Sequence, residues 1–487
     1  MAQSAGLPLW ARVLRVCEDV VDDAITLDPR KEFSEKNHTI IQQMFEGLVR
    51  LDTDGKIEPA LATSWRWVDE RSLEFTLREG VRFHNGEIFD AQAVKFSIEQ
   101  FVDPKVGYPG AGFLGSVEKV VVLDARHVVL KTKFVDGILP HRLAALITIM
   151  PPRYIAEHGD QYFAGHPVGT GPFKFVQWEK NKEIVLAANT DYWLKGYPKF
   201  TGLVFKFIPG DEQINQLLKG EIDLVTEVPG TATLEVMKSP IVRIVKKEGF
   251  YTVASSLNSK TGPLSDRRVR QALNYAVDKK DLIRYDLLGN GKSLATMTMP
   301  GEIGHNPGLK PYPYNPKKAR RLLTDAGYPD GFRVKALVKV NAMRTMQIIA
   351  KQLARVNIHV DIHPTTDAVA VSDMQKESWD WVYAGCPDPM SHSFFIHFIF
   401  LSSLSPFSVN KDAKYDELLT KMVGALDENE QHKIGMELDQ YVHEQALSLF
   451  TYQRIKIYGI RRDIHFIPPV TGVPYYVFSH PRETREE

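Results

Sequence analysis

Residues 73–99 read LEFTLREGVRFHNGEIFDAQAVKFSIE, and this stretch decides the fold. Apolar side chains alternate at its start, at Leu73, Phe75 and Leu77, as expected for a strand with one buried face. Asp90 then precedes a run with helical spacing over residues 91–101, and Asp is a favoured N-cap residue. The stretch therefore predicts a strand, a turn and a capped helix.

The sequence on either side of this stretch is also mixed. Alternation through Trp65 and Trp67 predicts two half-buried strands within residues 63–83, and residues 117–134 predict a hairpin. Helical spacing follows Ser265, and Asn315, Pro316 and Gly327 mark the start and end of another helix. Further strands are expected at 11–20, 182–189, 202–208 and 358–362, and further helices at 211–219, 231–238 and 343–353. The fold class is therefore α/β, without internal repeats.

Composition excludes several classes of protein. The chain has 487 residues, which allows two to four domains, and its 60 basic residues balance its 60 acidic ones. A net charge of zero gives no support for nucleic-acid binding, so no nucleic-acid partner is expected. The longest apolar run, residues 143–150, is bounded by Arg142 and Pro151 and is too short to span a membrane. Cys17 and Cys386 alone make neither a disulfide framework nor a four-cysteine zinc site, and we expect separate thiols.

Three motif-like stretches are explained better by structure than by chemistry. GAGFLG at 110–115 has a strand-like run after it rather than a helix, so it is interpreted as a loop and not as a dinucleotide site. GNGKS at 289–293 lacks the first glycine of a phosphate loop. His392 and His397 lack the spacing of a zinc-binding helix, and no nucleophile–base set is recognisable. We expect no cofactor and no enzyme activity; a metal-assisted hydrolase using His392 and Asp388 is the alternative from another class.

The stretch WDWVYAGCPDPMSHSFF, residues 379–395, is the most unusual in the chain. Trp379, Trp381 and Tyr383 alternate, which places them on one face of a strand that ends before Asp388 and Pro389. One interpretation is a buried strand followed by a loop. The other is an aromatic wall that ends in a polar loop, which is typical of a ligand cleft. The residues alone leave both open.

Taken together, five blocks in order resemble one known family. It comprises the family 5 extracellular solute-binding proteins of ABC importers, the dipeptide, oligopeptide and nickel class. The signature-like block is residues 73–99, and the others are 26–65, 167–193, 257–283 and 315–332. The resemblance covers nearly the whole chain.

The resemblance implies a fold and a division into domains. It predicts the two-lobed periplasmic-binding-protein fold (class II-like, cluster C) with an extra small α/β domain in the first lobe. Lobe I would comprise residues 1–45, 166–255 and 463–487, with 46–165 as its extra subdomain, and lobe II would be 256–462. Ligand would be trapped between the lobes by hinge closure. The Trp and Phe side chains of residues 63–87 are then packing residues.

The resemblance also implies ligand-binding residues. In the first lobe, Phe33, Ser34 and Glu35 form an extended segment that would pair with a peptide backbone, with Tyr108 nearby. The corresponding residues of the second lobe are Trp379, Trp381, Tyr383, Ala384, Gly385, Cys386 and Asp388, together with Tyr251. Arg344 is the candidate partner for a ligand carboxylate.

Two departures from the family pattern bear on the ligand. Peptide-binding relatives usually carry an aspartate for the ligand α-amine at the position of Gly385, and the arginine expected near residue 336 is missing. A dipeptide clamped at both ends is therefore in doubt. The loop around Asp388 also resembles the nickel-binding branch, which leaves a metal-chelate or other non-peptide ligand, with His392 as a metal ligand, as the alternative.

The sequence thus predicts a bacterial transport protein that captures a peptide or peptide-like solute and delivers it to an ABC permease in the membrane, without catalysis. We expect a monomer at a periplasmic or cell-surface location. Arg12 and Arg15 interrupt any apolar segment near the N-terminus, so no signal peptide is predicted there, and the native one is expected to be absent from this sequence.

Overall fold

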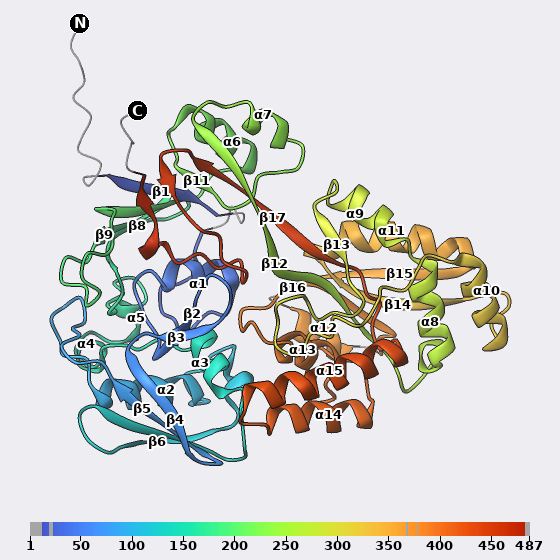
Figure 1. The fold of residues 1–487 in the computed structure, drawn as a ribbon, viewed down its shortest axis with the longest axis horizontal. Helices are drawn as coiled ribbons and strands as arrows, with labels where there is room; N and C mark the ends of the chain where they lie inside the picture. Colours follow the sequence, from blue (N-terminus) through green and yellow to red (C-terminus); the bar gives the residue numbers. More distant parts are fainter. Residues whose placement is uncertain (1–11, 19–22, 367–368, 377, 483–487) are drawn as a thin grey trace, which may run out of the picture. The chain divides into compact units, whose positions relative to one another are not determined.

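The computed structural model describes residues 12–18, 23–366, 369–376 and 378–482, and these form two compact units (Figure 1). The chain divides between Lys247 and Glu248 and again between Ile455 and Lys456. Unit 1 contains the described residues before the first division and after the second, and unit 2 contains those between. The lobe and subdomain bounds expected from the sequence stay a prediction.

Unit 1 contains a mixed sheet. Its strands, in order, are β8 (Phe173–Glu179), β9 (Glu183–Ala188), β10 (Gly202–Lys206), β1 (Val13–Cys17), β11 (Leu224–Val225) and the end of β17 (Tyr452–Arg461). β1 runs parallel to both of its neighbours, and its alternate residues Leu14 and Val16 are buried. α6 (Gly210–Lys219) contributes Ile214 and Leu217 to a core cluster with Val225. The strand expected at residues 11–20 is thus confirmed over Val13–Cys17, while residues 11, 19 and 20 lie outside the described residues.

A second, four-stranded sheet of unit 1 contains the opening stretch of sequence. Its order is β4 (Ala62–Asp69), β5 (Ser72–Leu77), β7 (His127–Thr132) and β6 (Val117–Val122). Leu73, Phe75 and Leu77 of β5 are buried. α2 (Ala91–Val102) begins after Asp90, whose side chain accepts hydrogen bonds from the backbone of Gln92 and Ala93. The predicted strand, turn and capped helix are confirmed.

The rest of unit 1 consists of short elements. These are α1 (Glu35–Ile41), β2 (Val49–Leu51), β3 (Ile57–Pro59), α3 (Leu139–Leu146), α4 (Pro152–His158), α5 (Asp160–Phe163), α7 (Thr233–Met237), β18 (Ile464–His465) and β19 (His480–Pro481). The GAGFLG stretch contains a short 3-10 helix, Ala111–Leu114, with β6 following it. This order differs from the strand–loop–helix of a dinucleotide site, as the sequence predicted.

Unit 2 is built on the strands β15 (Ile358–Thr365), β14 (Phe332–Lys339), β16 (Trp381–Pro387) and β12 (Val242–Leu257), in that order. β14 is parallel to β15 and β16, whereas β12 is antiparallel to β16. β13 (Gly291–Ser293) pairs with the start of β17. β12 and β17 are the two strands within which the chain passes from one unit to the other.

The helices of unit 2 are α8 (Arg267–Ala276), α9 (Lys279–Asp286), α10 (Pro316–Asp325), α11 (Met343–Leu353), α12 (Ala370–Lys376), α13 (Phe394–Leu401), α14 (Ala413–Val423) and α15 (Glu428–Gln445). The first four of them contribute side chains to the main core, which they share with the sheet. Leu273 of α8, Leu323 of α10 and Ile349 of α11 meet Val334 of β14 and Trp381 of β16 in the core. α10 begins at Pro316 with Asn315 as its cap, as predicted.

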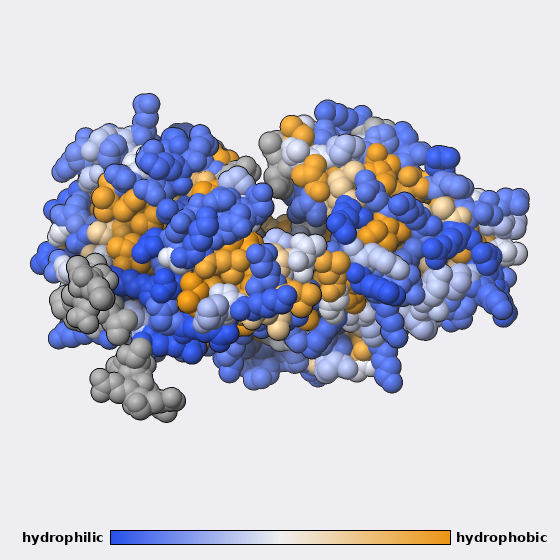
Figure 2. All heavy atoms as spheres, turned by 90° about the horizontal axis from the view of Figure 1, so that it is seen from above, coloured by the Kyte–Doolittle hydropathy of each residue, from blue (hydrophilic) through white to orange (hydrophobic). Residues whose placement is uncertain are grey.

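The face drawn in Figure 2 is mostly hydrophilic, with apolar residues in separate patches. Among the described residues, no helix has the length and apolar character needed to cross a membrane. Cys17 and Cys386 are both buried free thiols, as expected.

Candidate solute-binding site

The aromatic residues before and within β16 belong to two different packing clusters. Trp381 and Tyr383 are fully buried in the main core of unit 2. Trp379 precedes the strand and packs with Leu337 and Val382 in a separate cluster. The prediction that all three share one strand face is wrong for Trp379, because the strand begins only at Trp381. The buried-strand interpretation therefore describes Trp381 and Tyr383, and their role as ligand contacts stays a prediction.

The last residues of β16 continue beyond the end of β14. The parallel pairing reaches only Val338 and Tyr383, after which the chain of β14 turns away. The side chain of Asn341 replaces the missing strand partner. Its Nδ2 donates to the Gly385 carbonyl at 3.1 Å, and the Gly385 N–H donates to Asn341 Oδ1 at 3.2 Å. The side-chain amide thus satisfies the backbone of Gly385 in the manner of a neighbouring strand. The sequence signal for this role is an Asn two residues after the end of β14, and Asn341 was not among the predicted site residues.

Gly385 is a glycine because Tyr251 fills the space beside it. β12 pairs with β16 so that Val253 lies opposite Gly385 and Tyr251 lies two residues along on the same face. A Cβ atom at Gly385 would lie 2.0 Å from the Tyr251 hydroxyl oxygen, which is far inside van der Waals contact. The Arg454 guanidinium lies 5.4 Å from the centre of the Tyr251 ring, within cation–π range. The space beside Gly385 is thus filled by a phenol that lies next to an arginine.

Arg344 is already partnered within unit 2. Its guanidinium Nη2 donates to the Tyr285 carbonyl at 2.8 Å, and its Nε lies 3.6 Å from Asp286 Oδ1. Asp286 Oδ2 accepts from the hydroxyls of Thr345 and Tyr452, both at 2.6 Å. The Arg344 side chain is still 71% exposed, so these contacts leave much of it open to solvent. Its assignment to a ligand carboxylate stays a prediction.

Asp388 shapes the loop that follows β16. Its side chain is buried and accepts from the backbone N–H groups of Met390 and His392, both at 2.8 Å. Burial raises its pKa to about 6, and it shares a hydrogen bond with Glu302. An aspartate that holds its own loop together in this way has little capacity left for a ligand amine.

His392 and Cys386 also direct their polar atoms into unit 2. His392 Nδ1 accepts from the Phe394 N–H at 3.1 Å, and its Nε2 lies 3.3 Å from Gln431 Oε1. Cys386 is buried, and its thiol donates to the Pro387 carbonyl at 3.4 Å. No group of three or more potential metal-binding residues occurs among the described residues.

The predicted residues of unit 1 lie around the start of α1. Ser34 is the N-cap, and its hydroxyl accepts from the Asn37 N–H at 3.3 Å. Glu35 is therefore the first helical residue, which corrects the prediction of an extended segment: the cap ends the extended conformation at Ser34. The Phe33 ring lies 6.2 Å from the ring of Tyr108, which is buried and donates to the Leu146 carbonyl. The structure thus brings Phe33 and Tyr108 together.

Comparison with known proteins shows to which family the chain belongs. Residues 56–405 match the profile of the bacterial extracellular solute-binding proteins, family 5 (middle region). The chain belongs to this family. It is 29% identical over 371 residues to the glutathione-binding protein GsiB of Pectobacterium atrosepticum, covering 74% of this chain and 71% of that one. It is 30% identical over 454 residues to heme-binding protein A of Haemophilus influenzae, covering 83% and 80%.

Solved structures give the fold. The periplasmic binding protein DppA of Helicobacter pylori, solved with the peptide STSA, superposes with a TM-score of 0.83 at 24% identity, covering 97% of this chain and 98% of that one. The predicted two-lobed α/β fold of a periplasmic binding protein is confirmed. The predicted role as a solute-binding protein of ABC import is confirmed by the family match.

Proposed function

We propose that the protein captures a short, anionic, peptide-like solute of the glutathione type and delivers it to an ABC permease. It does so as an extracytoplasmic monomer, and no bond of the solute is made or broken. The identity of the solute rests on Gly385 and Tyr251. The proposal is supported by relatives whose names record binding of glutathione and heme, both of which carry carboxylates.

The observation that carries the proposal is the charge of the groups that lie beside Gly385 of β16. An aspartate at the position of Gly385 would attract a ligand ammonium group, and here the Tyr251 phenol fills that space. The Arg454 guanidinium lies 5.4 Å from the centre of the phenol ring and adds a positive charge there. Asp286 and Asp388, the acids that stand near, are held by hydrogen bonds within unit 2. An anionic solute suits these surroundings better than a cationic one.

The first experiment is native mass spectrometry of the purified protein, followed by denaturing extraction of any retained solute. Calorimetric titration then compares glutathione, its dimethyl ester and the dipeptide Ala-Ala amide. We expect glutathione to bind at least tenfold more tightly than the ester, because two charge-assisted interactions are lost with its carboxylates. Tighter binding of the dipeptide amide, which offers only an ammonium group, would overturn the anionic assignment.

Tyr251 is tested by a pair of variants. Gly385→Ala is expected to displace the Tyr251 ring and weaken glutathione binding, because its Cβ would lie 2.0 Å from the hydroxyl oxygen. Tyr251→Ala is expected to weaken binding by itself and to make the addition of Gly385→Ala nearly neutral. Additive losses in the double variant would show that the two residues act independently.

The same titrations test the alternatives. A nickel chelate requires metal for binding, and a chelator in the buffer would then abolish it; His392, the metal ligand that the sequence offered, already uses both ring nitrogens. A hydrolase would change the mass of the peptide during the titration. We expect binding that is insensitive to chelator and peptides that are recovered intact.

A further inference from the structure

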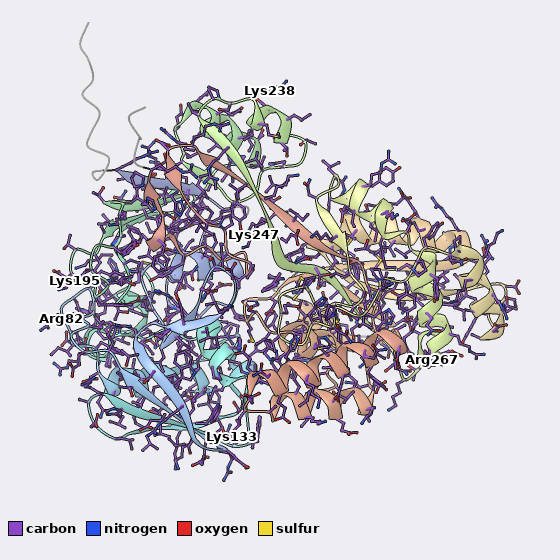
Figure 3. The ribbon with its side chains drawn as sticks, in the orientation of Figure 1. Arg82, Lys133, Lys195, Lys238, Lys247 and Arg267 are labelled. Atoms are coloured by element: carbon purple, nitrogen blue, oxygen red, sulfur yellow. The ribbon has the colours of Figure 1, made fainter. Side chains whose placement is uncertain are left out.

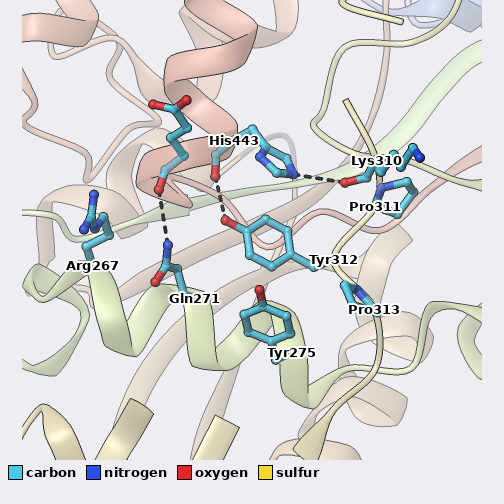
Figure 4. A pocket seen from close by; sticks show the side chains of 9 residues that line it. Arg267, Gln271, Tyr275, Lys310, Pro311, Tyr312, Pro313 and His443 are labelled. Atoms are coloured by element: carbon cyan, nitrogen blue, oxygen red, sulfur yellow. Dashed lines mark hydrogen bonds between the residues drawn. The ribbon is translucent and has the colours of Figure 1, made fainter. Parts of the chain in front are cut away.

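A pocket of about 450 Å³ lies on unit 2 (Figure 4), and neither Gly385 nor Tyr251 lines it. Three parts of the chain form it: the first two turns and a half of α8, the segment Lys310–Pro311–Tyr312–Pro313, and the end of α15. Its size falls within the usual range for small-molecule sites, which is about 300–1,000 Å³. The volume of the pocket is therefore large enough for a small ligand.

Aromatic rings form the base of the pocket. The rings of Tyr275 and Tyr312 meet edge to face with centroids 5.0 Å apart, and His443 packs against Tyr312 at 4.7 Å. The Tyr312 hydroxyl donates to the His443 carbonyl at 2.7 Å, and the His443 ring bonds the Lys310 carbonyl at 3.0 Å. These bonds connect α15 to the 310–313 segment (Figure 4), so the aromatic surface is fixed rather than loose.

The rim of the pocket carries two unsatisfied cations. Arg267, at the start of α8 (Figure 3), and Lys310 lie on opposite sides of the Tyr312 ring in Figure 4. Both side chains are exposed, and within the described part of the chain neither makes a hydrogen bond or a salt bridge. Two cations close by are partnered: Arg268 bonds Asp266 at 2.6 Å, and Lys318 donates to the Tyr275 hydroxyl at 2.7 Å.

A third cation lies behind the aromatic surface. Lys279 is buried, and among the described residues its ammonium group donates only to carbonyls, those of Asn274 at 2.9 Å and Tyr312 at 3.5 Å. Burial lowers its pKa to about 7, so a nearby anion would favour its charged form. The one acidic residue of the pocket is Glu444, whose carboxylate accepts from Gln440. The balance of charge around the rings is positive.

We propose that this pocket binds a small aromatic carboxylate, with the carboxylate at Arg267 and the ring against Tyr312 and Tyr275. A guanidinium binds a carboxylate in two parallel hydrogen bonds, and a flat apolar body can pack against the half-buried ring of Tyr275 and the small accessible part of Tyr312, which is 7% exposed. Lys310 adds charge from the other side. The site is independent of the solute proposed above, since its residues belong to α8, α15 and the 310–313 segment.

The test uses fluorine NMR of the full chain with three probes. 4-Fluorobenzoate is expected to broaden on addition of protein, whereas 4-fluorobenzylamine, which reverses the charge, and trifluoroacetate, which lacks the ring, are not. Arg267→Gln should weaken benzoate binding about tenfold, the usual effect of losing a hydrogen bond to a charged group, and Lys310→Gln should weaken it less. Lys351→Gln, at an exposed lysine of α11, is the control and should change nothing.

Thermal melts establish that each variant is folded before its binding is compared. Equal broadening by the benzylamine, an unchanged affinity in Arg267→Gln, or no broadening of the benzoate would each overturn the proposal. Excess glutathione should leave the benzoate signal broadened; its displacement would show that the probe occupies the solute site instead. If glutathione does not bind, the function proposed above is wrong, but the proposal for this pocket is unaffected.

Discussion

Glu46 in unit 1 and Glu302 in unit 2 are both buried, yet their surroundings differ. Glu46 accepts from the Tyr192 hydroxyl at 2.6 Å, from the Thr170 hydroxyl at 3.0 Å and from the Trp193 indole, which reaches both of its oxygens. Glu302 Oε2 accepts from the Met299 N–H, but Oε1 receives no donor from the described residues. One carboxyl group is surrounded by donors, and the other faces a second acid, Asp388.

This difference teaches how each acid can remain buried. Burial raises the pKa of both, and the donors around Glu46 oppose that rise. At Glu302 the neighbouring Asp388 raises the pKa further, so a proton on Glu302 can be donated to the Asp388 carboxylate. Glu46 is therefore built to accept hydrogen bonds as a carboxylate, whereas Glu302 is built to hold a proton.

The largest effect is expected from Asp388→Ala. This change leaves the buried N–H groups of Met390 and His392 without an acceptor and should lower the free energy of unfolding by about 3 kcal/mol. Denaturant unfolding of the variant and the parent measures the difference. Asp427→Ala is the control: Asp427 is an exposed helix cap bonding the Glu430 N–H, and its loss should cost only about 1 kcal/mol. Equal losses would mean that the Asp388 loop is not held by its side chain.

Next in size is a pair of identical changes, Glu46→Gln and Glu302→Gln. In Glu46→Gln, the side-chain NH₂ group would face the Tyr192 hydroxyl or the Trp193 indole, which are themselves donors. This loss of hydrogen bonds should lower the free energy of unfolding by about 2 kcal/mol. At residue 302 the amide can donate to Asp388 as the protonated acid does, so we expect a loss below about 1 kcal/mol. Equal effects in chemical denaturation would remove the distinction between the two acids.

A smaller effect is expected when one hydroxyl is removed in each unit. Tyr192→Phe deletes a donor to Glu46 and should cost about 1.5 kcal/mol of unfolding free energy, since the bond is to a charged group. Tyr383→Phe deletes a buried hydroxyl that has no hydrogen-bond partner among the described residues, so it should be neutral or stabilising. Melting temperatures of the two variants give the order. A clear loss in Tyr383→Phe would reveal a partner for that hydroxyl.

Local patterns in the sequence predicted the elements, but not the contacts between them. The strand, turn and helix of residues 73–99 follow from alternation and from the cap at Asp90, all of which lie within a few residues of one another. The placement of Trp379 failed because alternation does not show where a strand begins. The contact of Tyr251 with Gly385 depends on the pairing of β12 with β16, between segments far apart in the chain, and no local pattern reports it.

The smallest effect, taken per pH unit, concerns a third buried acid of unit 2. Asp439 accepts from the Thr298 hydroxyl and the Asn306 N–H, and burial raises its pKa to about 7. In the unfolded chain the same group ionises near pH 4. Between these values the folded state holds a proton that the unfolded state has lost, so its contribution to stability is complete below about pH 4. That contribution declines as the pH rises to about 7, by about 1.4 kcal/mol per pH unit.

Asp439→Asn removes this titration. The variant loses one acceptor and should therefore be less stable than the parent at pH 4.5, but the gap should narrow steadily up to pH 7.5, because only the parent loses stability through this group. Denaturant unfolding at four pH values between these limits measures the gap. A difference in stability that stays constant with pH would mean that Asp439 is already ionised in the folded protein. Asp439 would then resemble Glu46, a carboxylate stabilised by hydrogen-bond donors, rather than Glu302, which holds a proton.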